Sequence, residues 1–197
     1  MPSDDFVLDI LRESEALLEG HFILASGKHS AHYVQVAQLC QYPDRLAKIL
    51  NKTTSEFENL DFTTFVSAAI GGITVGQQLA FLHGKRHVFC ERKDNIMLLR
   101  RGFNFKAGEK IVLVEDVMTT GGTINEIRAI VEERGAEIVG IFALVNRSGE
   151  TGETWDGFKF VHSIHLQFPV FDADQVPAEL TEIPVSRPGS KKVPGKA

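Results

Sequence analysis

One stretch decides the fold of this chain: Ile111-Val112-Leu113-Val114-Glu115-Asp116-Val117-Met118-Thr119-Thr120-Gly121-Gly122-Thr123. Four apolar β-formers lead into two adjacent carboxylates, and a loop of Thr and Gly follows. The apolar run predicts a strand that is buried on both faces, as in a parallel sheet. The two acids would then lie at the carboxyl end of that strand, which is where open α/β sheets bind ligands. As strand-end residues they are expected to be exposed and to lie outside the core.

The loop at residues 119–123 is suited to hold an anion. Its glycines let backbone N–H groups approach a ligand, and its hydroxyls add donors. The helix expected after the loop points its N-terminus at the same place, which favours a phosphate. Acids beside a phosphate are useful if they accept hydrogen bonds from sugar hydroxyls or face a metal. Together these features describe a site for a phosphorylated ribose, although an ordinary strand–turn–helix with polar turn residues is the simpler alternative.

Composition sets broad limits on the chain. The 197 residues suffice for one domain with a full core, and contents of 43% apolar and 24% charged residues are ordinary for a globular protein. The net charge of −5 argues against a general nucleic-acid binder. No apolar run is long enough to span a membrane, and the acidic N-terminus lacks a signal-peptide pattern. Cys40 and Cys90 fit a reducing compartment, so we expect a cytoplasmic protein.

Hydrophobic spacing predicts a first helix, a strand-and-turn segment at 21–39, and then alternating strands and helices. This alternation implies a parallel sheet with helices on both faces. The first expected helix is capped by Ser3 or Asp4, has Ile10, Leu11, Leu17 and Leu18 on one face, and ends at Gly20. Two further helices are expected at Asp44–Asn51 and Gly72–Leu82. The last expected helix runs through Ile124, Ile127 and Val131 and ends at Arg134-Gly135. The expected strands are Phe62–Ser67, Arg86–Cys90, Ile111–Val114, Glu137–Val145 and Phe158–Ile164, and the tail from Pro184 is expected to be loosely ordered.

The 111–123 stretch closely resembles the phosphoribosyl pyrophosphate (PRPP) loop of type I phosphoribosyltransferases. The resemblance implies that fold: a central parallel sheet flanked by helices, with a small hood from the two terminal segments. We therefore expect a single domain over 1–197, with a core at about 41–165, a hood at about 1–40 plus 166–190, and a loose tail at 191–197. It also implies that Glu115 and Asp116 are catalytic and contact the ribose hydroxyls, and that PRPP is bound by Val117, Met118, Thr119, Thr120, Gly121, Gly122 and Thr123.

A second glycine-containing loop follows the strand that ends at Ser67. Ile70, Gly71 and Gly72 precede a helix, and by chain order this loop should lie beside the first one. In type I phosphoribosyltransferases the corresponding loop binds pyrophosphate, so these three residues are expected to bind PRPP. A tight helix start, with Gly chosen for packing, is an equally good interpretation of this signal alone.

A third cluster is basic and lies in a long segment before the central strand. Long loops inside compact domains are often functional lids, and cations there could meet a departing pyrophosphate. A solvated β-hairpin with surface charge is the simpler alternative, and the apolar run 96–99 favours it. Under the resemblance we expect Arg92 and Lys93 to be catalytic, and PRPP to be bound by Arg92, Lys93, Arg100 and Arg101.

Within the type I families, residues 20–35 resemble the Phe-x-Leu-x-Ser-Gly-x-x-Ser segment of orotate phosphoribosyltransferases, which forms a hood over the base. The stretch Asn146-Arg147-Ser148-Gly149 is similar to the one that carries an orotate-contacting Arg. A guanidinium matches the orotate carboxylate. The resemblance therefore implies that orotate is bound by Ser26, Gly27, Thr119 and Arg147. Three positions depart from the best-known branch, which has Lys where this chain has Ala25 and Ile96, and His where it has Leu98.

The resemblance implies transfer of a phosphoribosyl group from PRPP to orotate, giving orotidine 5′-monophosphate and pyrophosphate. It implies Mg²⁺ carried by PRPP near the acid pair without direct protein ligands, and a homodimer with a loop shared across the interface. No nucleic-acid or membrane partner is expected. Two alternatives stay open: a phosphoribosyltransferase for another base, and a PRPP-binding regulator without catalysis.

Overall fold

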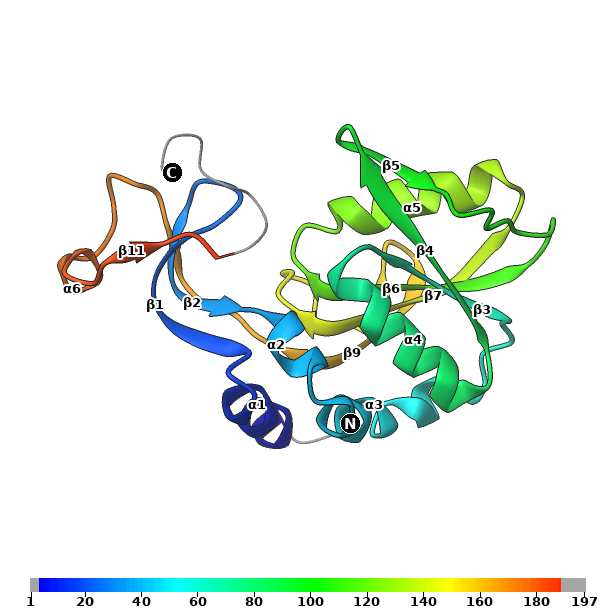
Figure 1. The fold of residues 1–197 in the computed structure, drawn as a ribbon, viewed down its shortest axis with the longest axis horizontal. Coiled ribbons are helices and arrows are strands. Elements are labelled where there is room, and N and C mark those ends of the chain that lie inside the picture. The colour runs from blue at the N-terminus through cyan, green and yellow to red at the C-terminus, as the bar shows by residue number, and fades with distance from the viewer. Residues whose placement is uncertain (1–3, 189–197) are drawn as a thin grey trace.

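The computed structural model describes residues 4–188, and these form two β-sheets with helices packed around the larger one (Figure 1). The first third of the chain contains α1 (Asp4–Glu13), β1 (Leu17–Ile23), β2 (His29–Val34), α2 (Val36–Cys40), α3 (Pro43–Asn51) and the 3₁₀ helix η1 (Thr54–Phe57). The middle contains β3 (Thr64–Ala68), α4 (Gly71–His83), β4 (Arg86–Lys93), β5 (Ile96–Leu99), β6 (Lys110–Met118) and α5 (Gly122–Glu133). The last part contains β7 (Glu137–Asn146), β8 (Thr154–Trp155), β9 (Phe158–His165), β10 (Val170–Phe171), α6 (Ala178–Thr181) and β11 (Val185–Ser186).

The larger sheet has seven strands in the order β5-β4-β3-β6-β7-β9-β8. Its five inner strands run parallel, and the short edge strands β5 and β8 pair antiparallel to their neighbours. The expected parallel α/β sheet is thus confirmed, with β6 at its centre. The acid-bearing strand is central because α5 leads from it to β7 on one side. On the other side, the chain that leaves β4 returns through β5 and residues 100–109 and enters β6 beside β3.

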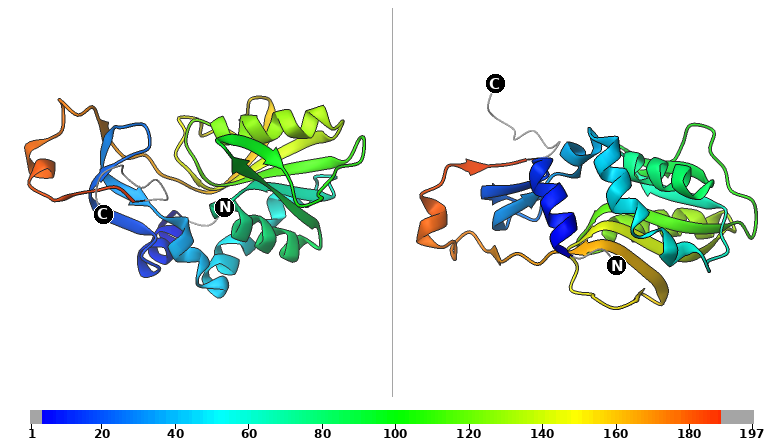
Figure 2. Two further views of the ribbon diagram at one scale, coloured as in Figure 1. Left: turned by 45° about the horizontal axis from the view of Figure 1, so that its top comes forward. Right: turned by 90° about the horizontal axis from the view of Figure 1, so that it is seen from below.

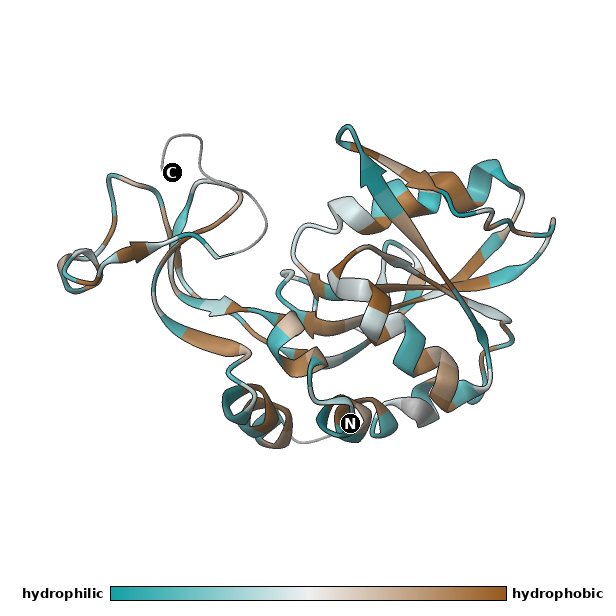
Figure 3. Cartoon of the chain, viewed as in Figure 1, coloured by the Kyte–Doolittle hydropathy of each residue, from teal (hydrophilic) through white to brown (hydrophobic). Residues whose placement is uncertain are grey.

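Helices cover both faces of this sheet, so its strands are apolar on both sides. One core cluster lies under α1, α3 and α4 and includes Phe65, Val112 and Phe142. The other lies under α5 and includes Leu113 and Ile127. Figure 3 shows apolar residues along the inner strands and polar residues on the outward turns of the helices. None of the helices within residues 4–188 combines the length and apolar character needed to cross a membrane.

The smaller sheet stands to one side of the larger one (Figure 2) and has the order β10-β2-β1-β11. It brings together segments from both ends of the chain, since β11 pairs parallel to β1, with His21 opposite Val185. The expectation of a loose tail from Pro184 is wrong for residues 185–186, which form this strand. The expected tail at 191–197 lies outside the described residues.

The first helix is shorter than expected. It ends at Glu13, and Glu15 adopts a positive φ of 52°, so the chain turns and the amide of Ala16 donates to the carbonyl of Leu11. Leu17 and Leu18 then lie in β1 opposite Val34 and Tyr33. The prediction of a helix as far as Gly20 was therefore wrong, because pairing with β2 outweighs a helical spacing that is compatible with both structures.

Candidate active site

The acid pair lies within β6 and not beyond it, because the strand continues to Met118. Glu115 is only 9% exposed, and Asp116 is half-buried. Burial, with the neighbouring Asp116, raises the pKa of Glu115 to about 7, against smaller lowering effects that include a hydrogen bond with Thr123. Burial also raises the pKa of Asp116, although backbone hydrogen bonds at Val117 and at Asp116 itself oppose this. The expectation of exposed acids outside the core was wrong, and the site holds two carboxyl groups in a poorly solvated place.

The 119–123 loop joins this strand to α5. Gly121 adopts the left-handed conformation, with φ of 73°, and α5 begins at the next residue. The amide of Asn125 donates the first helical bond to the carbonyl of Gly121, at 2.9 Å. Thr119, Thr120 and Gly122 are exposed. The backbone N–H groups at the start of a helix lack partners within it, so this exposed loop can present them to an anion.

The second glycine loop, residues 70–72, lies directly against the acid pair. A Cβ atom built on Gly71 would lie 1.9 Å from Oδ2 of Asp116, so any larger residue there would displace the Asp116 carboxyl group. Ile70 is 82% exposed, and the peptide that joins it to Ala69 is cis. Since β3 and β6 are neighbours, the two loops lie at the same edge of the sheet with Asp116 between them. The structure therefore brings the two expected phosphate loops together.

The basic cluster lies on a β-hairpin formed by β4 and β5. Asp94 and Asn95 both have positive φ, as a two-residue type I′ turn requires. Arg92 forms a bidentate ion pair with Glu126 of α5. After the hairpin come Arg100 and Arg101, both of which bond to Glu91, at 3.2 and 2.8 Å. Among the residues that the structure describes, Lys93 forms no ion pair.

Arg147 follows β7 and approaches the site from the strand beside the acid pair. Its backbone amide donates to the carbonyl of Met118 at 2.7 Å, which fixes it next to the start of the 119–123 loop. Its guanidinium lies 5.2 Å from the ring centroid of Phe168, and within residues 4–188 its buried Nε has no hydrogen-bond partner. Burial lowers the pKa of this group. An unpaired, poorly solvated arginine is poised to receive a carboxylate.

Tyr33 connects the smaller sheet to this site and was missed as a site residue by the sequence reasoning. Burial raises the pKa of Tyr33, the charge of Asp116 raises it further, and Arg147 opposes the rise. The phenol on β2 is therefore within electrostatic range of both groups. Its signal was present, since it lies inside the quoted 20–35 segment, but nothing in the spacing of that segment showed which side chain would face the acids.

Ser26 and Gly27 form the turn between β1 and β2. Gly27 has a positive φ of 84° and donates to the carbonyl of Leu24, and the amide of Lys28 bonds to Ser26. Both turn residues and the adjacent Ala25 are exposed. Within residues 4–188, no hydrogen bond joins this turn to the acid pair.

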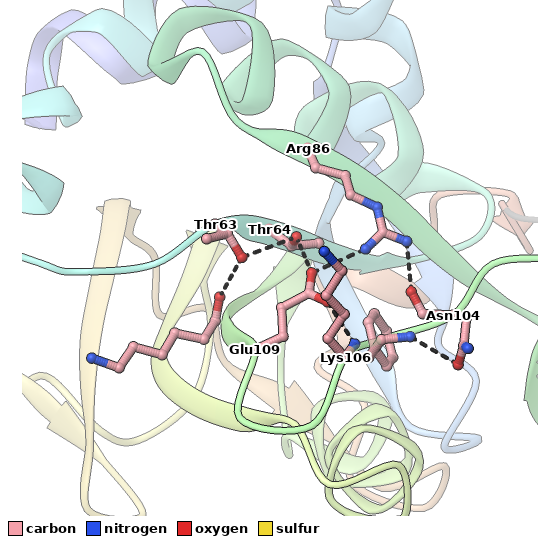
Figure 4. Close-up of polar contacts among 8 residues, drawn as sticks. Thr63, Thr64, Arg86, Asn104, Lys106 and Glu109 are labelled. Carbon is pink, nitrogen blue, oxygen red and sulfur yellow. Dashed lines mark hydrogen bonds and ion pairs between the residues drawn. The ribbon is translucent and has the colours of Figure 1, made fainter.

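A different polar cluster occupies the opposite, amino edge of the sheet (Figure 4). Glu109 accepts hydrogen bonds from the Thr64 hydroxyl at 2.5 Å, the Lys106 amide at 2.8 Å and Arg86 at 3.0 Å. Arg86 also donates to the carbonyl of Asn104 at 2.6 Å. Burial would raise the pKa of Glu109, but these partners lower it. The bonds fasten the segment that returns from the hairpin, residues 100–109, onto the sheet.

The fold and the acid pair between two glycine loops define a phosphoribosyltransferase. Residues 90–175 match the family model of the phosphoribosyl transferase domain. Two curated relatives named orotate phosphoribosyltransferase are similar over nearly the whole chain. The one from Caldicellulosiruptor bescii is 39% identical over 188 residues, which is 95% of this chain and 98% of the relative. The one from Caldicellulosiruptor saccharolyticus is 40% identical over 186 residues, which is 94% of this chain and 96% of the relative.

The fold is also that of a solved structure. The crystal structure of orotate phosphoribosyltransferase from Aeropyrum pernix superposes with a TM-score of 0.65 at 21% identity, over 81% of this chain and 93% of that one. The expected type I phosphoribosyltransferase fold is therefore confirmed. With its curated relatives, this chain belongs to the orotate phosphoribosyltransferase family.

Proposed function

We propose that this chain transfers the phosphoribosyl group of PRPP to orotate, releasing pyrophosphate and forming orotidine 5′-monophosphate. One observation carries the proposal beyond family membership. A buried acid pair lies between two glycine loops, and an unpaired arginine, Arg147, follows the adjacent strand. The three parts match the three parts of the reacting system: a ribose, its two phosphorylated ends, and a base that carries a carboxylate.

The acids act on the ribose. Glu115 and Asp116 accept hydrogen bonds from the 2′ and 3′ hydroxyls, and their negative charge stabilises the positive charge that develops at the anomeric carbon. That character parallels glycoside cleavage. Burial raises the pKa of both groups, so the site is poorly solvated. A positive charge that develops on the ribose would there favour the ionised carboxylates and be strongly stabilised by them.

The two loops act on the phosphates. Residues 119–123 hold the 5′-phosphate with backbone N–H groups and hydroxyls, and residues 70–72 hold pyrophosphate. Arg92 and Lys93, with Arg100 and Arg101, supply positive charge as pyrophosphate departs. For this, Arg92 must exchange its carboxylate partner Glu126 for the leaving group. The reaction is driven by positioning and electrostatics, and it needs no covalent nucleophile.

Orotate binds between Arg147 and the smaller sheet. The guanidinium pairs with the orotate carboxylate, Thr119 and the Ser26-Gly27 turn contribute further contacts, and N1 attacks the face of the sugar opposite to pyrophosphate. The configuration at the anomeric carbon is therefore inverted. The buried, unpartnered Nε of Arg147 supports this assignment, because a cation in such a place gains strongly from a carboxylate.

Mg²⁺ fits the donor set as an ion brought by PRPP. Glu115 and Asp116 offer hard oxygen ligands, yet within residues 4–188 no three His, Cys, Asp or Glu side chains gather into a metal site. When bound, the ion neutralises pyrophosphate oxygens. The acid pair would lie near it and contact the ribose hydroxyls.

We further propose a homodimer in which the β4–β5 hairpin of one subunit completes the site of the other. Mixing two inactive variants tests this: one with Arg92 and Lys93 changed to Ala, the other with Glu115→Gln and Asp116→Asn. Random pairing gives one intact site in each mixed dimer, so activity should recover to about a quarter of the wild-type value. A monomer, or mixed dimers without recovery, would contradict the shared hairpin. The two free cysteines suit the reducing cytoplasm, where we place the reaction.

The experiment that tests the function is loss of orotate absorbance on addition of PRPP, with and without Mg²⁺. Consumption of orotate that depends on both additions supports the proposal. A panel of purine bases tests the alternative substrate, since turnover of a purine without orotate would overturn the assignment of Arg147. Binding of PRPP without turnover of any base would indicate a regulator.

A further inference from the structure

The chain contains one tryptophan, and its ring lies against the 119–123 loop. A Cβ atom built on Gly121 would lie 2.2 Å from Cζ2 and 2.8 Å from Cη2 of Trp155, so the indole occupies the space where any other side chain would go. Gly121 is the last residue before α5, and it is buried. The ring therefore supports the loop at the residue where its backbone turns into the helix.

Trp155 is itself held by a tight hairpin. It pairs with Phe158 across the strands β8 and β9, and the two residues between them, Asp156 and Gly157, both have positive φ. A two-residue turn with both φ angles positive matches the twist of its strands and is stiff. Trp155 and Phe158 also pack on the core cluster under α5. The support behind the loop is thus a defined element and not a mobile side chain.

The same hairpin is attached to α5. Arg128 of α5 donates to Asp156 at 2.5 Å and to Glu132 at 2.8 Å, and its guanidinium lies 4.9 Å from the ring centroid of Phe158. The hairpin therefore contacts the helix one and a half turns after its start and the loop just before it. Together the two contacts fix the first turn of α5, which carries the backbone N–H groups of the anion site.

On another side the indole borders open space. A cavity of about 520 Å³ is lined by Trp155 with Asn125, Glu150, Thr154 and Asp156. A truncated side chain at this position would enlarge that cavity, and no packed neighbour on that side could take over the contact with Gly121.

We propose that Trp155 is a positioning residue for the loop that binds the 5′-phosphate, holding Gly121 so that the N–H groups at the start of α5 meet the phosphate. This rests on the proposed function, in which residues 119–123 bind that group. The 5′-phosphate takes no part in bond making or breaking, so its contacts are equal in the bound substrate and the transition state. A misplaced loop therefore raises KM for PRPP and leaves kcat nearly unchanged.

The first test compares steady-state constants of three variants. Trp155→Ala should raise KM for PRPP about ten-fold, which is the loss of about 1.4 kcal/mol of uniform binding, with KM for orotate and kcat within about three-fold. Trp155→Phe keeps a ring and should recover most of the loss. Phe81→Ala removes an exposed aromatic side chain from α4 and serves as the control with wild-type constants. A wild-type KM in Trp155→Ala, or an equal loss of kcat and rise of both KM values, would overturn the proposal.

The second test uses the fluorescence of the single indole in the wild-type protein. Inorganic phosphate, ribose 5-phosphate and PRPP should each change the emission saturably, whereas orotate alone should not. Because this readout needs no turnover, it separates the two claims. An enzyme that converts orotate while its emission ignores all three phosphates would refute the proposal and leave the function standing. An emission change without turnover of orotate would do the reverse.

The third test asks whether Gly121 and Trp155 act together on phosphate binding. In Gly121→Ala the new methyl group collides with the indole and the left-handed φ adds strain, so affinity for ribose 5-phosphate should fall more than in Trp155→Ala. In the double variant the collision is gone, so its affinity should equal or exceed that of Gly121→Ala. Losses that simply multiply would show that the two residues act independently.

Discussion

Two glutamates at opposite ends of one strand show how differently this protein treats its two sheet edges. The side chain of Glu109, just before β6, is 9% exposed within a half-buried residue, and Glu115, inside the far end of β6, is 9% exposed as a whole residue. Partners lower the pKa of Glu109 despite burial, whereas burial and Asp116 raise the pKa of Glu115 to about 7. The carboxylate of Glu109 is thus paired within the protein, whereas that of Glu115 is available to a ligand.

The arginines repeat the contrast. Arg86 at the amino edge bonds to Glu109 and to a backbone carbonyl, whereas Arg147 at the carboxyl edge has a buried Nε without a partner. The amino edge also holds a cavity of about 840 Å³, but both acids that line it, Asp61 and Glu109, are bonded to cations. A hollow by itself therefore does not mark the active site. The active site is marked instead by charged groups without a partner in the fold, because these groups can pair with the substrate.

The largest expected effect is on catalysis. Changing Glu115→Gln and Asp116→Asn together should lower kcat about a thousand-fold or more, since charge stabilisation in a dry site is worth several kcal/mol. Stability near neutral pH should not fall, because the substitutions remove buried charge. Rate assays and urea unfolding of the same preparations measure both. A variant that is inactive because it is unfolded would break the contrast between the two edges.

The arginines should separate activity from stability. Arg147→Ala should raise KM for orotate about fifty-fold, equivalent to about 2–3 kcal/mol, with KM for PRPP little changed. Arg86→Ala is the matched control and should lower stability while KM for orotate stays at the wild-type value. Equal effects of Arg147→Ala on both substrates would assign that residue a structural role instead.

Glu109→Ala should destabilise the protein by about 3 kcal/mol, because it leaves Arg86, Thr64 and the Lys106 amide without their shared acceptor. The loss should appear as a lower urea midpoint, with kcat of the folded enzyme within a factor of about two. Glu109→Gln keeps an acceptor oxygen and should lose less. A collapse of kcat in a stably folded Glu109→Ala would show that the amino edge also serves the reaction.

Stability should also depend on pH through Glu115. The pKa of Glu115 rises from 4.5 to about 7 on folding, so folding takes up a proton between these values. Stability from this group is therefore present below about pH 4.5 and is lost as pH rises through about 7, by about 3 kcal/mol. Glu109 has the opposite sign and loses its contribution as pH falls. Urea midpoints of Glu115→Gln between about pH 5 and pH 8 should lack the decline seen in wild type, and an unchanged decline would assign it to other groups.

Much of the site could be predicted because it is contiguous in sequence. The strand, acids and loop of 111–123 follow one another, and chain order alone places the 70–72 loop beside them. The raised pKa of Glu115 could not be predicted, because burial within the folded sheet is its largest cause, and Thr123 and the hairpin residue Arg92 come near Glu115 only in three dimensions. The position of the acids on the strand could thus be predicted from the sequence, whereas their pKa depends on how the folded chain packs around them.

The smaller sheet was the least predictable part. Its strands are short and come from both ends of the chain, so no local sequence pattern predicts that Val185 lies opposite His21 in the sheet. The positions of the two aromatic residues near the site, Tyr33 and Trp155, could not be predicted for the same reason. Tyr33 lies within electrostatic range of Asp116, and Trp155 contacts Gly121, each from a segment distant in sequence.

The pairing of β1 with β11 also has a consequence for synthesis of the chain. All strands of the larger sheet lie between residues 64 and 165, so they are synthesised before residues 185–186. β1 precedes all of these strands, yet one of its edges stays unpaired until the last described strand is made. An unpaired edge is a template for wrong partners. During translation, β1 is therefore made before the larger sheet but is paired on both edges only after that sheet is complete.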